Sequence, residues 1–129
     1  MSALSDYSEN LVVNVLLRNQ AHTGAATVYA ALHTADPTDA GTGTECSYSG
    51  YARKAAAFTA PSNGVTSNSA QIDFAANGSG SAVVVTHVAV WDALTSGNLL
   101  FHATLTTSKT LQSGDVLSFA IGALQITLA

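Results

Sequence analysis

The sequence predicts a mainly β protein: an antiparallel, jelly-roll-like β-sandwich of about seven strands with one N-terminal α-helix. Three observations predict this class. A helical period of apolar residues is confined to the start of the chain, strand-like alternation follows it, and turn residues separate the later segments. A length of 129 residues suits one domain. We expect a helix and arm over 1–22 and the sandwich over 23–129.

Residues 3–19 are predicted to form the helix. Apolar residues recur at steps of three and four from Leu4 to Leu16, which gives a broad stripe. Ser5 is suited to cap the N-terminus, and Arg18 suits the dipole of the last turn. The width of the stripe indicates that the helix packs on something large, either an open edge of the sandwich or a neighbouring molecule.

Strands are expected wherever β-branched and aromatic residues gather between turns. The expected ranges are 27–34, 51–58, 70–75, 82–91, 99–106 and 116–128, the last of them split near Gly122. The connecting segments are rich in Asn, Gly and Ser, and no helical pattern intervenes. This order favours an antiparallel arrangement.

The strand expected over 82–91 is apolar on both faces. Strict alternation would place Val83, Val85 and Ala89 on one face and the other valines on the opposite face. A two-layer sandwich covers only one face of such a strand from within. The second face must therefore meet the N-terminal helix, a long loop or another subunit.

Charged residues are unusually scarce, and this scarcity excludes several classes of function. They make up 9% of the chain, against roughly 25% in ordinary soluble domains, and the net charge is −4. Four cations cannot form the positive field that nucleic acids or anionic membranes require. An uncharged surface is typical of a chain that identical neighbours cover, so we expect a homo-oligomer.

The N-terminus and the single cysteine give two further expectations. No basic start precedes the apolar run 11–17, which is too short to span a bilayer, so neither a secretion signal nor a membrane span is expected. Cys46 cannot form an intramolecular disulfide. One unpaired thiol is compatible with assembly in a reducing cytoplasm.

Metal binding has two weak candidates. His87 and His102 lie on different expected strands and could meet across them, but hydrogen-bonded or half-exposed strand histidines are the favoured interpretation, because no ligand cluster surrounds them. The acidic loop with Asp36, Asp39 and Glu45 could offer oxygens to calcium, although it lacks EF-hand spacing. The simpler interpretation is a loop whose aspartates bond the local backbone. No cofactor is predicted.

Catalytic and sugar-binding interpretations lack support in the sequence. No nucleophile elbow or phosphate loop is present, and nothing pairs Asp73, Asp92 or Glu45 as glycosidase carboxylates. A sugar platform could be formed by Trp91, Tyr29, Tyr48 and Tyr51. Trp91 stands at an expected strand end, however, where packing at the core margin is the simpler explanation. We therefore expect no enzyme.

Several blocks of the chain carry a family resemblance. They read LSDYxEN from residue 4, LHTADPTDAGTGTE from residue 32, GYAR from residue 50, THVAVWDA from residue 86 and GNLL from residue 97. In this order they resemble a family of small tailed-phage and prophage virion proteins commonly labelled tail fibre proteins. The resemblance implies a structural protein of the virion, assembled in the host cytoplasm, and it supplies no catalytic residues.

The resemblance also points to one candidate interaction region. The blocks 36–45 and 50–53 would form a structured loop and the strand after it, at a subunit contact. Arg53 would make an ion pair or clamp a loop, because guanidinium groups suit carboxylates and carbonyls. Asp36 or Asp39 would be its partner. The candidate interaction residues are Asp36, Asp39, Glu45, Tyr51 and Arg53.

Two structural functions remain open at this stage. No repetitive shaft sequence is present, so a compact capsid decoration or cement protein, bound as a trimer to the major capsid protein, is our first expectation. The alternative is a tail fibre or tail-tip component with a face that binds host glycans. The sequence does not decide between the two.

Overall fold

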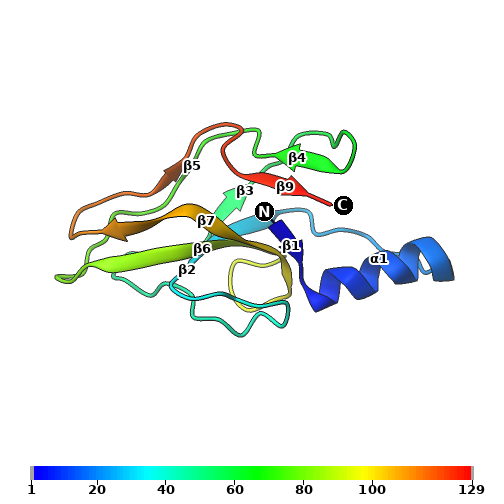
Figure 1. Cartoon of the computed structure of the whole chain (residues 1–129), viewed down its shortest axis with the longest axis horizontal. Helices are drawn as coiled ribbons and strands as arrows, with labels where there is room; N and C mark the ends of the chain where they lie inside the picture. Colours follow the sequence, from blue (N-terminus) through cyan, green and yellow to red (C-terminus); the bar gives the residue numbers. More distant parts are fainter. Residues whose placement is uncertain (1, 129) are drawn as a thin grey trace.

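The computed structural model describes residues 2–128 and confirms a mainly antiparallel β-sandwich with one helix (Figure 1). The elements are β1 (Ser2–Leu4), α1 (Asp6–Arg18), β2 (Val28–His33), β3 (Lys54–Ala56), β4 (Val65–Ser67), β5 (Ile72–Asp73), β6 (Val83–Trp91), β7 (Leu99–Leu111), β8 (Ser118–Phe119) and β9 (Gln125–Thr127). The expected split of the last segment falls at Gly122, whose φ is +81°.

One five-stranded sheet carries the fold. Its strand order is β1-β7-β6-β2-β3, and every neighbouring pair is antiparallel. Two short ribbons, β4-β9 and β5-β8, lie over one face of this sheet (Figure 1). The core between the two layers includes Leu32 and Val85 from the sheet and Ile72, Phe74 and Leu124 from the opposite layer.

The helix is shorter at its N-terminus than the sequence predicts. Residues 2–4 are extended and pair with the start of β7, where Leu4 lies opposite Phe101. Ser5 then caps the helix as expected, because its Oγ accepts a hydrogen bond from the Ser8 amide at 3.1 Å and also donates to the Leu99 carbonyl. Asn19, in the left-handed conformation, ends the helix. Leu4 fits the helical pattern of apolar residues, but its pairing with the edge of the sheet keeps it in a strand.

A bulge in β6 overturns the strict alternation expected for that strand. The register with β7 shifts between Val85 and His87. Because the bulge turns the backbone, Val85 and Val88 enter the same core, although they are three residues apart. Ala89 and Trp91 consequently face the other side of the sheet. Val88 and Ala89 therefore lie on the opposite faces from those expected, and Val84 is 46% exposed instead of covered.

The long loop after β2 covers this second face of the sheet. Ala31, Ala89 and Leu99 are buried there, and Trp91 packs against them. Gly41 lies against the sheet so closely that an added Cβ atom would stand 3.3 Å from the Trp91 ring and 3.4 Å from Leu99. The need for a second cover, expected from the doubly apolar strand, is therefore met by a loop.

The structure contains two strands that the sequence did not predict, and a third strand is longer than predicted. The strands β1 and β4, of three residues each, were not predicted, and β7 extends to Leu111 instead of ending at residue 106. Thr107 and Ser108 look like turn residues, but the chain continues because Lys109 to Leu111 pair with the start of β6. Short edge strands depend on their partners, which local composition does not reveal.

Candidate functional site

Arg53 is the centre of the most highly connected polar site. It precedes β3, and only 8% of its surface is exposed. Its Nε and Nη2 donate to the two carboxylate oxygens of Glu45 at 3.0 and 2.9 Å. Its Nη1 donates to the carbonyl oxygens of Ala93 and Ser96, both at 2.8 Å. The guanidinium group also lies over the Trp91 ring, with Cζ 4.2 Å from the ring centroid. Arg53 thus clamps two loops to the sheet.

Tyr51 completes the environment of the Glu45 carboxylate. Its hydroxyl donates to Glu45 Oε2 at 2.6 Å and accepts a hydrogen bond from the Leu32 amide at 3.1 Å. Burial and the hydrogen bond to Glu45 raise the pKa of Tyr51 far above its usual range. Burial opposes ionisation of Glu45, but the hydrogen bonds from Arg53 and Tyr51 outweigh it and lower its pKa. The carboxylate is therefore held in its charged form.

Asp36 and Asp39 do not contact Arg53, so the predicted pairing was wrong. Both aspartates face His102 on β7 instead. The Asp39 carboxylate lies 2.8 Å from His102 Nε2, and Asp36 Oδ1 lies 3.6 Å from Nδ1. The Asp39 carbonyl accepts a hydrogen bond from the Asp6 amide at 2.9 Å, which ties this loop to the first turn of α1. The five candidate residues therefore form two separate anchors of one loop.

His33 was not among the predicted interaction residues, although it lies in the LHTADPT block of the family resemblance. His33 is 1% exposed and stacks on Trp91, with ring centroids 6.2 Å apart. Neither ring nitrogen of His33 has a hydrogen-bond partner in the structure. Burial lowers its pKa, although Glu45 opposes this effect. Two signals pointed to His33: its place in the resemblance block, and the apolar strand pattern before it, which predicts a covered strand.

The other candidate residues are dispersed. Asp73 bonds Gln71 and Ser118, whereas Asp92 bonds Asn98, so these carboxylates do not converge with Glu45. Across residues 2–128, no three His, Cys, Asp or Glu side chains are placed to hold a metal. Cys46 is buried, and burial raises its thiol pKa to about 11. No helix in the described range is long and apolar enough to cross a membrane.

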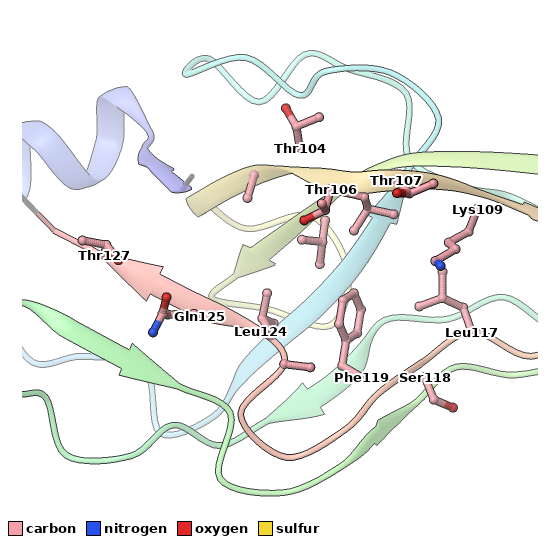
Figure 2. Close-up of a pocket in the computed structure, with 14 residues that line it drawn as sticks. Thr104, Thr106, Thr107, Lys109, Leu117, Ser118, Phe119, Leu124, Gln125 and Thr127 are labelled. Carbon is pink, nitrogen blue, oxygen red and sulfur yellow. The ribbon is translucent and has the colours of Figure 1, made fainter.

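A groove of about 500 Å³ lies between β7 and the segments that carry β8 and β9 (Figure 2). Its walls combine apolar side chains such as Leu117, Phe119 and Leu124 with threonines of β7. Lys109 is the only charged residue that lines it. Hydroxyls and one amine give the groove hydrogen-bonding capacity, but they do not form a nucleophile paired with a base.

A comparison with protein-family models tests the resemblance found in the sequence. A model of the family described as podophage GP4 fiber I protein gp80 matches residues 3–127. The chain belongs to this family. The match confirms the resemblance to phage fibre-type virion proteins and identifies the chain as a virion component. A search of curated proteins found no match.

Proposed function

We propose that this member of the fiber I family is a non-enzymatic structural component of a phage fibre. The family match over residues 3–127 carries this proposal. It favours a fibre component over the capsid decoration protein that we expected first from the sequence. The chain would be incorporated into virions in the host cytoplasm and would contact other virion proteins.

The polar geometry supports a building block rather than a catalyst. Arg53, Glu45 and Tyr51 use their hydrogen-bonding groups on one another and on backbone carbonyl or amide groups. Such a site fixes two loops over the sheet. A rigid surface is what repeated contacts within a virion need, because ordering a flexible loop on binding costs free energy.

The composition supports assembly from several identical copies. Only 9% of the residues are charged, so the surface carries little of the charge that keeps monomers apart. We therefore retain the proposal of a homo-oligomer, with a trimer as the expected form. Contact with the major capsid protein belongs to the decoration alternative and is not part of the proposed function.

Gold labelling of intact virions tests the proposed location. An epitope inserted at Gly80, which lies in an exposed turn with open space around it, should leave the fold intact. We expect antibody-linked gold at the tail or its fibres and few copies of the chain per particle by quantitative mass spectrometry. Gold distributed over the whole head, with many copies per particle, would overturn the fibre proposal in favour of capsid decoration.

A further inference from the structure

The outer half of α1 is an apolar arm that the chain itself does not cover. Val13, Leu16 and Leu17 are 48%, 73% and 79% exposed, and Ser8, near the start of the helix, is its only buried residue. Figure 1 shows this end of the helix projecting away from the strands. A helix of 13 residues gains little stability alone, and most helical stability comes from packing an apolar face.

An apolar groove of about 450 Å³ lies beside the base of the same helix. One wall is formed by Leu11 and Val12, the other by the returning segment 22–25, and Phe101 of β7 contributes from the sheet. A Cβ atom added at Gly24 would meet nothing within 4 Å, so the groove is open at this residue. The chain therefore carries both an uncovered apolar projection and an unfilled apolar groove.

We propose that the outer half of α1 of one copy seats in this groove of a second copy. The inference rests on the proposed homo-oligomer and names its interface. Opposite charges on the arm and in the groove favour the helix of a second copy as the group that fills the groove. Arg18 is the only charged residue between Asn10 and Val28, and Asp92 lines the groove. The Asp92 carboxylate accepts hydrogen bonds from Asn98, and within the described residues no cation lies beside it. An incoming Arg18 would supply one.

This contact has a defined symmetry. Each copy gives one arm and accepts another, so the two surfaces in contact are different. Such head-to-tail contacts close into a ring when the rotation between copies permits it. The expected trimer is one such ring, and the arm would then hold neighbouring copies together at their sheet edges, where β1 and α1 meet β7.

Sedimentation of the full-length protein tests the contact with matched variants. Leu16→Gln with Leu17→Gln removes the apolar end of the arm, and Gly24→Leu fills the groove. Both changes fall on exposed positions, so the fold should persist, as circular dichroism can verify. Ile121→Gln and Gly80→Leu are the controls, since Ile121 is 70% exposed elsewhere and Gly80 also lies in open space.

We expect wild-type protein and both controls to form the same oligomer. Each test variant should weaken association at least about tenfold, because apolar contacts at an interface centre carry much of its affinity. A monomeric wild-type protein, or arm variants that associate like wild type, would overturn the proposed contact. So would equal weakening by the Ile121 control.

Crosslinking gives an independent measurement of the same contact. A mixture of Leu17→Cys and Thr23→Cys proteins should form a disulfide between copies on mild oxidation, since the native Cys46 is buried. If the oligomer persists but this crosslink does not form, the copies meet through a different surface and the proposed contact is wrong. Gold labelling of the virion is unaffected by either result, so failure of this interface and failure of the fibre proposal are distinguishable.

Discussion

At the scale of single residues, the Arg53 cluster explains how two loops stay fixed. The guanidinium group is nearly buried and satisfies two carbonyl oxygens and one carboxylate at the same time. A buried charge is tolerated only when such partners are complete. Removing one partner should therefore cost more than removing a charge from the exposed loop surface.

The variant Glu45→Gln tests whether the buried Arg53 charge depends on its carboxylate partner. The change leaves Arg53 without its counter-ion, and we expect the free energy of unfolding to fall by about 3 kcal/mol. The control is Asp39→Asn, which breaks a more exposed contact with His102 and should cost below about 1 kcal/mol. Urea denaturation measures both. Equal losses would contradict the assigned role of Arg53.

His33 makes stability depend on pH. Because burial lowers its pKa from 6.5 in the folded state, the unfolded chain binds the proton more readily in the window just below 6.5. Stability is therefore full above this window and is lost as pH falls through it. We expect a lower free energy of unfolding at about pH 5.5 than at about pH 7.5.

The variant His33→Phe removes the titrating group and should flatten this dependence. Wild-type protein at the same two pH values is the comparison for this variant. Denaturant titrations at the two pH values measure the difference. An unchanged slope in the His33 variant would show that another group controls stability in this range.

At the scale of elements, the long loop after β2 acts as part of the sandwich. It covers the second face of the sheet and is folded so tightly that a Cβ atom at Gly43 would stand 2.1 Å from the Asp36 carbonyl oxygen. Gly43→Ala should therefore open the loop and lower the free energy of unfolding by about 2 kcal/mol.

The comparison for this prediction is Gly80→Ala, where an added Cβ atom meets open space. We expect that variant to stay within about 0.5 kcal/mol of wild type. Fluorescence of Trp91, which the loop covers, follows loop opening directly. If both alanine variants have the same stability and spectrum, the loop is not a fixed layer of the fold.

The sequence predicted those elements whose structure depends on neighbouring residues in the chain. Ser5 was recognised as a cap from its type and position, and alternation placed Ile72 and Phe74 inside and Asp73 outside, as the structure shows. The bulge after Val85 was not predictable, because it depends on how β6 meets β7. The partner of Arg53 was wrong for a similar reason, since three carboxylates lay on one loop and only folding selects among them.

At the scale of the whole molecule, a scarcity of charge and an uncovered helix point the same way. Charged side chains of the chain bind one another within the fold, whereas the apolar outer half of α1 stays exposed. Isolated soluble proteins seldom expose large apolar patches, whereas interfaces do. Membership of the fiber I family provides a setting in which other protein surfaces can cover this arm.

A cryo-EM map of the virion is the most direct test of the proposed fibre role. The five-stranded sheet, its loop layer and the projecting helix give a recognisable outline for fitting the density (Figure 1). We predict that this chain occupies density in the fibres, with the outer half of α1 covered by a neighbouring copy. Density for this chain on the outer surface of the head, and none in the fibres, would contradict the account.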